Sequence, residues 1–594
     1  MTEESGLFHV DRTPGWRWPL VCVLAVVGTL LAAYGLWWYE IAHWGRADIG
    51  SVLYHTLQMF ILHTPYFEPP VSISLQLGRW LIAGASLLAV ATALLRIFRE
   101  EAQLLRLRWT KGHVVVCGLG ELGRQLTTEF RKAGNKVVAI ESRPDNPSVP
   151  QLRSQGVTVL VGDACEEAML RKARVGHARQ VLATCSDEET NIAVAAAVAK
   201  AAEPRGGPIE HWLFIGDPQL RATLKSRDVF PGAGPGYKVN VRGLDLYELS
   251  ARQAFWAHPL DHSPILEGSS KRVHLVIAGF GQMGLAMALQ AARIGHFVNG
   301  TRMRITIIAP AAGTCWKDFS ARYPQFTEIC DVDAPCEVPL DSRQLVQRLA
   351  TYCPEDEAKD FLLTYAVCFE PSHTGGAADQ LNLAVGLELA ERTRHCRAPV
   401  LLRLKKRCGC ASLLPDEGRN ANVPPHLHPF GMLEDTLCRS TLLHEEQDTL
   451  AHALHEAYLD QQRSADDFGK KRAHRSWEEL DEDLRESNRQ AADHISIKVR
   501  ALGLHIGSLQ SGAMTAAAFT PHEIELLAKM EHARWCAEKW LDGWVYGPER
   551  DDARKIHPDL KAWDDLPDKD KKIDLTLVSA IVGALKEVEK GIYR

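Results

Sequence analysis

Two glycine fingerprints of the form G-x-G-x-x-G constrain this chain more than any other feature. They are Gly118-Leu-Gly120-Glu-Leu-Gly123 and Gly279-Phe-Gly281-Gln-Met-Gly284, and each follows an apolar strand and opens a predicted helix. Glycines in this arrangement let the backbone approach a pyrophosphate, which the helix N-terminus binds through its N–H groups and its dipole. One fingerprint alone is weak evidence. Two in this context predict α/β architecture with two tandem Rossmann-like parallel-sheet modules.

Two apolar segments precede the fingerprints. The 21 residues from Pro19 to Tyr39 carry no charge, which matches the roughly 20 residues that cross a bilayer as a helix. A second segment runs from about Leu77 to Phe98, with Arg79 and Arg96 near its ends. The alternative for the first segment is a cleaved signal peptide, which would have a shorter apolar core. We therefore expect two transmembrane helices.

The charges around these segments predict their orientation. Arg99, Arg106, Arg108 and Lys111 follow the second segment, whereas the loop between the two offers only Arg46. By the positive-inside rule, both termini are cytoplasmic in a multi-pass membrane protein.

The stretch between the two segments predicts a short helix. Ser51 to Thr64 is uncharged and too short to span, which favours a re-entrant or interfacial helix. A pore helix occupies this place in two-span potassium channels, but the T-V-G-Y-G filter is absent from the sequence. Potassium selectivity is therefore unsupported, and a pore of another kind stays open.

The first module continues with the elements that a dinucleotide site needs. His113 to Cys117 reads as a buried strand, Glu121 to Lys132 as the helix, and Lys136 to Ile140 as a second strand followed by Glu141. An acid about 20 residues beyond the glycines can bind ribose hydroxyls. We therefore expect Gly118, Gly120, Gly123 and Glu141 to bind a cofactor.

The segment from about Lys111 to Leu249 resembles the TrkA-N family, also called KTN or RCK domains, which gate potassium channels and transporters. The resemblance is carried by Gly162-Asp163-Ala164 after the third strand and by Asp187-Glu-Glu-Thr-Asn191 after the fourth. It implies that Asp163 lies near the adenosine of an adenine nucleotide (NAD/NADH or ATP/ADP), and that Asp187 to Asn191 lie near the phosphates. A Rossmann core without nucleotide is the alternative.

The second module repeats this order of strands and glycines but lacks the acid. Its strands are His274 to Ala278 and Arg304 to Ile308, but Pro310 and Ala311 stand where the first module has Glu141. A degraded counterpart of Gly-Asp-Ala spans 330–334, and Asn382 matches Asn191. Gly279, Gly281 and Gly284 remain candidate ligand residues. Ligand binding and a purely structural, dimer-forming role both stay open, and the ligand is unknown.

The C-terminal third reads as helices with an internal repeat of two helical units. Leu450-Ala451-x3-His455-x2-Tyr458 returns as Leu527-Ala528-x3-His532-x2-Trp535, and Trp477-Glu-Glu-Leu480 returns as Trp563-Asp-Asp-Leu566. Such repetition is typical of paired helical hairpins that share a buried face.

The stretch from His522 to Tyr593 resembles the RyR domain, found in ryanodine receptors and in many bacterial proteins. Glu531-His532-x-x-Trp535, Gly543-Trp544-x-Tyr546-Gly547 and His557-Pro558-x-Leu560 carry the resemblance. It implies a small helical domain, whose bacterial versions are suspected of binding nucleotide-derived signals. Aromatic faces can stack on a base and an arginine fork can hold phosphate, so the ligand candidates are Trp535, Trp544, Tyr546 and Arg550; a role in the domain's core is the alternative.

Composition excludes several function classes. A formal charge of −6 gives no reason to expect nucleic acid as a partner. The 14 cysteines show no zinc-site spacing and are expected to be reduced thiols, with no metal bound. No hydrolase, metalloprotease or P-loop motif is present, so we expect no catalytic residues and no enzyme activity.

These observations predict four parts: a two-span hairpin with a cytoplasmic linker helix (1–110), a TrkA-N-like Rossmann domain (111–260), a divergent one (261–440), and an all-α RyR-like domain (441–594). The expected function is a nucleotide-sensing, ion-channel-like effector of the bacterial inner (plasma) membrane. It would work as a homo-oligomer, with a tetramer favoured, because two spans per chain cannot enclose a pore. The alternatives are an anchored nucleotide-signal receptor without a pore, for example in phage defence, and a membrane-bound NAD-dependent oxidoreductase.

Overall fold

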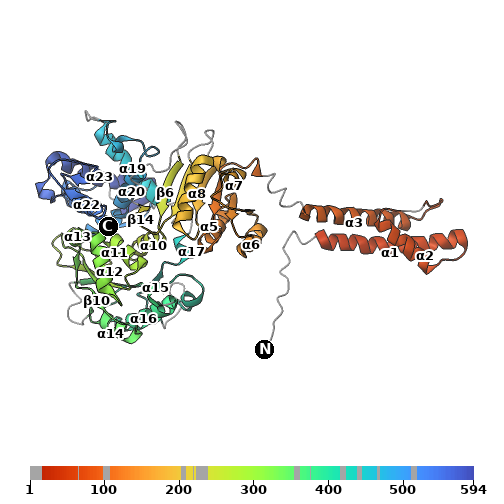
Figure 1. The fold of residues 1–594 in the computed structure, drawn as a ribbon, viewed down its shortest axis with the longest axis horizontal. Helices are drawn as coiled ribbons and strands as arrows, with labels where there is room; N and C mark the ends of the chain where they lie inside the picture. Colours follow the sequence, from red (N-terminus) through yellow and green to blue (C-terminus); the bar gives the residue numbers. More distant parts are fainter. Residues whose placement is uncertain are drawn as a thin grey trace. The chain divides into compact units, whose positions relative to one another are not determined.

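The computed structural model describes residues 17–63, 66–97, 107–201, 209–217, 220–221, 239–353, 361–374, 376–414, 423–437, 445–463, 468–509 and 518–593. Figure 1 follows the elements along the chain. Among the predicted features, Thr64, Phe98, Arg99 and Arg106 lie outside the described residues.

Three helices form the N-terminal hairpin: α1 (Arg17–Trp44), α2 (Ile49–Phe60) and α3 (Ile73–Ile97). α1 is longer than the predicted span and ends just before Gly45, which takes a φ of 68°. α2 is the expected short helix between the spans. It is capped by Asp48, whose carboxylate accepts a hydrogen bond from the N–H of Ser51.

Small residues let α1 and α3 approach closely. A Cβ atom on Gly78 would lie 2.5 Å from the backbone nitrogen of Ala32, and one on Gly35 would lie 2.6 Å from Leu75. Such contacts are typical of helices that associate in lipid. The outer faces keep large apolar side chains exposed, among them Leu30, Leu57, Trp80 and Leu87.

By length and composition, two of these helices can cross a membrane. The apolar stretches are Trp18–Trp44, with a mean hydropathy of 2.2, and Ile73–Leu94, with a mean hydropathy of 1.6. Together with the exposed apolar faces, they indicate an association with membranes.

The first Rossmann-like sheet has six parallel strands in the order β3-β2-β1-β4-β5-β6. Strands β1 (His113–Cys117) and β2 (Val137–Glu141) are buried throughout, and α5 (Glu121–Lys132) packs on both. The other strands are β3 (Thr158–Val161), β4 (Ala178–Ala183), β5 (Ile209–Phe214) and β6 (Val239–Leu244). Helices α7 (Glu167–Lys172) and α8 (Glu188–Ala201) follow β3 and β4. The strand order reverses between β1 and β4, and folds of this kind bind ligands at the carboxyl ends of the strands that flank such a reversal.

The second sheet repeats the order as β10-β8-β7-β11-β12-β13, with β9 pairing to β8. Its central strands are β7 (Arg272–Ala278), β8 (Arg304–Ala309) and β11 (Phe361–Val367). At one edge lie β9 (Asp331–Val332) and β10 (Cys336–Glu337), and at the other β12 (Val400–Arg403) and β13 (Leu427–Phe430). Helix α11 (Gln282–Ile294) follows the second fingerprint, α10 (Leu246–Ala257) packs against it, and α12 (Ala312–Arg322), α13 (Phe326–Ile329), α14 (Ser342–Ala350), α15 (Pro371–Thr374), α16 (Ala378–Arg392) and α17 (Leu433–Thr436) complete the module.

The C-terminal region is mainly helical. Its helices are α19 (Glu445–Gln462), α20 (Glu482–Asp493), α21 (Ile495–Ala501), α22 (Pro521–Leu541) and α23 (Asp568–Glu587). The expectation of an all-α domain missed two small sheets. One pairs β14 (His505–Ser508) with β17 (Lys590–Tyr593), and the other pairs β15 (Val545–Tyr546) with β16 (Ile556–His557). Strands this short carry too little hydrophobic alternation to be read from sequence.

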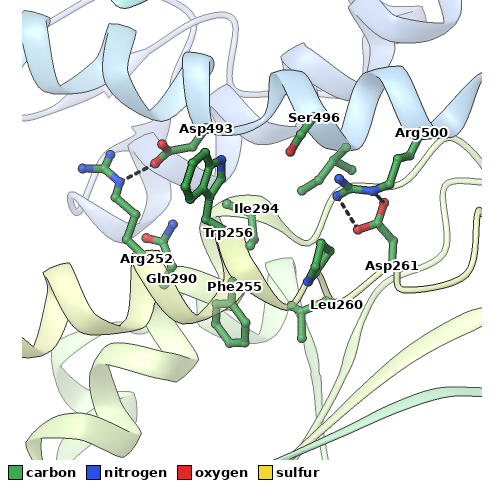
Figure 2. Close-up of a pocket in the computed structure, with 12 residues that line it drawn as sticks. Arg252, Phe255, Trp256, Leu260, Asp261, Gln290, Ile294, Asp493, Ser496 and Arg500 are labelled. Carbon is green, nitrogen blue, oxygen red and sulfur yellow. Dashed lines mark hydrogen bonds and ion pairs between the residues drawn. The ribbon is translucent and has the colours of Figure 1, made fainter. Parts of the chain in front are cut away.

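One hydrophobic cluster joins the second module to the C-terminal helices. It runs without a break from Ala251 in α10, through β7 and α11, to Leu527 in α22 and Ile592 in β17. Figure 2 shows two ion pairs at this junction, Arg252 with Asp493 and Arg500 with Asp261, on either side of a cavity of about 20 Å³. The cavity holds little more than a water molecule, so the two parts fold as one body.

A pair of glycines tests the packing of the hairpin. Gly78→Leu would press a side chain into the backbone of α1, whereas Gly84→Leu meets no atom within 4 Å of its Cβ. Overpacking costs about 1–3 kcal/mol, so we expect Gly78→Leu to lower the thermal midpoint of the protein in detergent, measured by size-exclusion chromatography after heating. Gly84→Leu should match the wild type, and equal midpoints for both variants would contradict this packing.

Candidate functional site

The first glycine loop leaves space where a phosphate would bind. Gly118 has a φ of 91°, and a side chain on Gly123 would clash with the carbonyl oxygen of Gly118. Gly120 differs, because a Cβ atom there would meet no protein atom within 4 Å. In the described part of the chain, no side chain accepts hydrogen bonds from the N–H groups of Glu121 and Leu122, the first residues of α5. The loop is therefore held by Gly118 and Gly123 and is open at Gly120.

Glu141 lies at the end of β2, beside this loop. One carboxylate oxygen accepts a hydrogen bond from the N–H of Leu119 at 2.8 Å, and the other accepts one from the N–H of Arg143 at 2.9 Å. The side chain is 5% exposed. The hydroxyl of Ser142 donates to one of these oxygens as well, at 3.4 Å, so Glu141 holds the backbone of the glycine loop in place.

Asp163 and two cysteines lie along the same edge of the sheet. Asp163 is exposed and accepts a hydrogen bond from the N–H of Cys165 at 2.8 Å. Burial, followed by the charges of Cys165, Asp187 and Glu141, raises the pKa of the Cys185 thiol to about 12. The structure thus brings Glu141, Asp163 and Asp187 to one edge, where their carboxylates disfavour a thiolate.

Asp187 and Asn191 have structural partners. Both carboxylate oxygens of Asp187 bind Thr190, one through its N–H and one through its hydroxyl, which lowers the pKa of Asp187. Asn191 is buried; its amide oxygen accepts from the N–H of Cys185, and its amide nitrogen donates to the carbonyl of Phe214 at 3.0 Å. Asn191 therefore clamps the ends of β4 and β5, while Asp187 caps α8.

Two lysines of the second module reach the rim of the first glycine loop. Lys406 Nζ lies 2.6 Å and Lys405 Nζ 3.1 Å from the carboxylate of Glu121, the first residue of α5. Burial opposes ionisation of Glu121, but the two lysines outweigh it and lower its pKa. Positive charge is thus held at the N-terminus of α5, where an anion would bind.

The second glycine loop is filled. Both oxygens of Glu370 accept hydrogen bonds from α11, from the N–H of Gln282 at 2.9 Å and from that of Met283 at 3.0 Å. A Cβ atom on Gly281 would clash with the same carboxylate. Asp333, from the degraded Gly-Asp-Ala, pairs instead with Arg304 at 2.8 Å. Of the three predicted glycines, Gly281 thus faces a carboxylate of the chain itself, whereas Gly279 lies against the backbone of Cys368 and Gly284 against the carbonyl of Gly279.

In the C-terminal region, two of the four predicted ligand residues lie together. Trp535 and Trp544 each contact the ring of His557, at centroid distances of 5.0 and 6.0 Å, and Lys539 lies about 6 Å from both indoles. Burial, with nearby Arg550 and Lys539, lowers the pKa of His557 to about 4, so this ring is neutral at pH 7.

Tyr546 and Arg550 lie on the adjacent loop. Tyr546 is 58% exposed, and the guanidinium of Arg550 pairs with Asp552 at 2.7 Å. An indole pair with a cation beside it can stack a base. For Arg550, phosphate would have to compete with Asp552.

Beneath this cluster lies a buried network of charges. Lys498 contacts Glu531 at 2.6 Å, and Arg534 contacts Glu531 and Glu538, each at 2.8 Å. Burial opposes ionisation of Glu531, but the charges of Arg534 and Lys498 lower its pKa to about 2. Lys498 comes from α21 and the other three residues from α22, so the network joins the two helices.

The two helical units make equivalent contacts. The imidazole of His455 bonds to the carbonyl of Arg475 at 2.8 Å, and that of His532 bonds to the carbonyl of Lys561 at the same distance. Trp477 lies 6.1 Å from His455, and Trp563 lies 5.9 Å from His532. The repeated sequence phrases thus correspond to repeated geometry.

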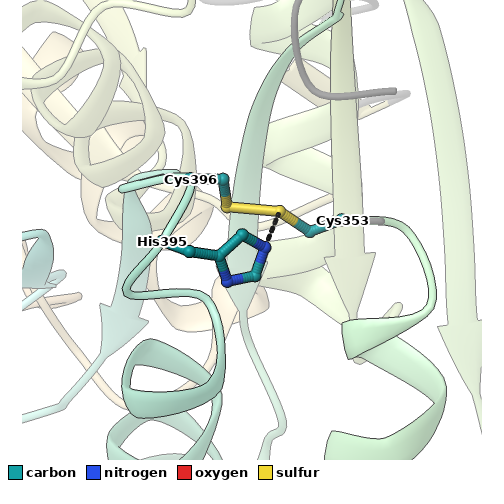
Figure 3. A group of neighbouring side chains, drawn as sticks. All are labelled: Cys353, His395 and Cys396. Carbon is teal, nitrogen blue, oxygen red and sulfur yellow. Dashed lines mark hydrogen bonds between the residues drawn. A yellow bond between two sulfur atoms is a disulfide. The ribbon is translucent and has the colours of Figure 1, made fainter. Parts of the chain in front are cut away.

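The expectation that all cysteines are reduced was wrong at one place. Cys353 and Cys396 are joined by a disulfide, and His395 Nε2 lies 3.7 Å from the sulfur of Cys353 (Figure 3). Within the described ranges, these three side chains form a group whose ligand atoms lie close enough together to hold a metal. Sulfurs bonded to each other are not thiolate ligands. The spacing of 43 residues hid the pair, which the packing of α14 on α16 brings together.

Sequence reasoning missed Glu370, Lys405, Lys406, Lys539 and His557. Glu370 stands three residues after β11, but nothing in the local sequence shows that its carboxylate meets Gln282. The lysines could not be found, because they act across two modules.

Comparisons with known proteins agree with this geometry. The TrkA-N domain model matches residues 114–209, and the RyR domain model matches residues 518–592. The chain therefore contains a TrkA-N domain and a RyR domain, separated by a second Rossmann-like sheet.

Curated relatives match over part of their length. Potassium channel protein 1 of Methanocaldococcus jannaschii is 25% identical over 105 residues, 18% of this chain and 32% of the relative. The Trk system potassium uptake protein TrkA of Mycobacterium tuberculosis is 29% identical over 133 residues, 19% of this chain and 56% of the relative. A solved structure described as the GsuK channel bound to NAD has a TM-score of 0.35 and 12% identity, covering 72% of this chain and 84% of that one.

Two glycines of the first loop test whether the loop is open at Gly120. Gly123→Ala places a methyl group against the carbonyl of Gly118, so we expect a loss of several kcal/mol of stability, or no folded protein. Gly120 has an extended backbone and open space, so Gly120→Ala should unfold at the wild-type midpoint in urea. If Gly120→Ala is as unstable as Gly123→Ala, the loop is not open as described.

Proposed function

We propose that this chain is a nucleotide-sensing membrane protein whose first Rossmann-like module binds an adenine nucleotide and thereby controls the N-terminal hairpin. The observation that carries the proposal is the open N-terminus of α5 at Gly120, inside the segment that matches the TrkA-N model. That segment lies just after two helices apolar enough to cross a bilayer.

The residues around the loop fit a nucleotide. The N–H groups at the start of α5 and the helix dipole suit a pyrophosphate. Glu141 stands at the end of β2, where an acid can bind ribose hydroxyls, and exposed Asp163 lies on the same edge for the adenosine side. The open loop supports NAD/NADH and ATP/ADP equally, because all four carry a pyrophosphate. Asp187 and Asn191 would act by shaping the loop rather than by touching the ligand.

The N-terminal hairpin would be the part that the nucleotide controls. Its exposed apolar faces need lipid or further copies of the chain. A central pore requires several copies, and we propose a tetramer in the inner membrane with both termini in the cytoplasm. The curated relatives are a potassium channel protein and a potassium uptake protein, which supports ion flux as the controlled process. A nucleotide opens such an assembly only by binding the open arrangement more tightly.

A second candidate is a nucleotide-signal receptor that the hairpin merely anchors. The indole pair of Trp535 and Trp544 beside Lys539 favours it, because the cluster offers a second place for a base. In this reading the hairpin conducts nothing. An oxidoreductase is disfavoured, because the glycine loop is accompanied by carboxylates and high-pKa thiols rather than by a base poised near neutral pH.

Binding is tested first at Glu141. Glu141→Ala removes the ribose acceptor and frees the N–H of Leu119, so we expect affinity for ADP or NAD to fall by roughly 1–2 kcal/mol, about 5- to 30-fold, in calorimetry. Asp333→Ala, which removes a carboxylate of the second module that pairs with Arg304, should leave affinity unchanged. Wild-type affinity in Glu141→Ala would remove Glu141 from the site.

The lysines of the second module give a separate prediction. A phosphate at the start of α5 would attract Lys405 and Lys406 away from Glu121. The double variant Lys405→Ala/Lys406→Ala should therefore bind ADP about 3- to 10-fold more weakly and with a shallower salt dependence, in line with two weak surface contacts. Lys569→Ala, another exposed lysine, is the control. Unchanged affinity and salt dependence would exclude the lysines from the site.

Ion flux separates the two candidate functions. We expect purified protein in liposomes to conduct monovalent cations when an adenine nucleotide is added, and Glu141→Ala to need more nucleotide for the same flux. Flux absent with every adenine nucleotide, together with intact binding, would favour the anchored receptor.

A further inference from the structure

The two Rossmann-like modules can be matched residue by residue at their ligand edges. In the first sheet Cys117, the last residue before the glycine loop, pairs with Ala183. In the second sheet Ala278 holds the same place and pairs with Val367. The strands that follow the chain reversal therefore end at equivalent positions.

An asparagine clamp extends the match by two residues. Asn191 accepts a hydrogen bond from the N–H of Cys185 at 2.8 Å, and Asn382 accepts one from that of Phe369 at 3.0 Å. Both asparagines also donate to the carbonyl at the end of the next strand or just beyond it. Equivalent backbone therefore leads to the next residue in each module.

That next residue is Ser186 in the first module and Glu370 in the second. The carboxylate of Glu370 takes the N–H groups of Gln282 and Met283, which are the donors that phosphates use at a helix N-terminus. Where Gly120 faces open space, Gly281 faces this carboxylate.

Glu370 is fixed in this position. It is 5% exposed, and its own N–H donates to Nδ1 of His373 at 3.1 Å. The guanidinium of Arg403 lies 3.9 Å from its carboxylate and over the ring of Tyr247. The buried charge is thus balanced by an arginine and by the positive end of α11.

We propose that Glu370 is a built-in ligand of the second module: its carboxylate occupies the place of a nucleotide's phosphates, so this module is closed to nucleotides and serves as a scaffold. The corollary, that only one of the two Rossmann-like modules binds a nucleotide, rests on the proposed function of the first module. The binding of Glu370 to the N-terminus of α11 does not depend on that function.

Exchanging the two residues tests the proposal in the full chain. Ser186→Glu should fill the first loop and reduce ADP binding at least 30-fold while the protein stays folded. In that background, Glu370→Ser vacates the start of α11 and should lower the thermal midpoint, and millimolar inorganic pyrophosphate should restore it. Glu370→Gln keeps the shape and one acceptor, so it should show no response to pyrophosphate.

The outcomes are distinct. A midpoint for Ser186→Glu/Glu370→Ser that equals its parent, or one that pyrophosphate does not raise, would overturn the proposal. So would two ADP molecules bound per chain of the variant Trp535→Ala/Trp544→Ala, which lacks the indole cluster as a second place for a base; this measurement decides the matter even if Glu370→Ser does not fold. If the wild type binds no ADP while Glu370→Ser responds to pyrophosphate, the proposed function of the first module fails and the role of Glu370 stands.

Discussion

The N-terminus of the helix that follows each glycine loop is the constraint on which the rest depends. Its first N–H groups have no partner within the helix and carry the positive end of the helix dipole, so they favour an anion. The second module meets this demand internally, because Glu370 binds the N–H groups of Gln282 and Met283. The first module has Ser186 at the equivalent place and leaves the position to solvent or to a ligand. A duplicated fold thus yields one permanently satisfied copy and one that can report the presence of a nucleotide.

This division agrees with how the second module is built into its surroundings. It shares one hydrophobic cluster with the C-terminal helices, and buried ion pairs such as Arg252 with Asp493 reinforce the junction. A module whose opening and closing depended on ligand would strain such a continuous core, because close-packed interiors transmit displacement. A self-liganded module has a single state and fits this position. From it, Lys405 and Lys406 extend to Glu121, so the second module contacts the first at the N-terminus of α5.

Much of this could be predicted from the sequence, because local patterns determine it. The strand His113 to Cys117 and the helix Glu121 to Lys132 have the expected bounds, since an uninterrupted apolar run and a glycine loop define both ends. Contacts between distant segments could not be predicted. Glu370 lies 88 residues from Gln282, and only the strand order brings them together. The disulfide of Cys353 and the two small C-terminal sheets were missed for the same reason, since neither spacing nor periodicity marks them.

The strength of the contact at Glu121 bears on how many chains must act together. The carboxylate of Glu121 is 34% exposed, and the amines of Lys405 and Lys406 are about half exposed, at 53% and 47%. Pairs of this kind contribute about 0.2–1 kcal/mol each, so exchanging both for contacts with phosphate shifts an equilibrium by at most about 2 kcal/mol per chain. Moving a two-state assembly from 1:99 to 99:1 needs about 5.5 kcal/mol. One chain is therefore too weak a switch through these contacts alone, so a nucleotide that acted through them would need several chains that change state together.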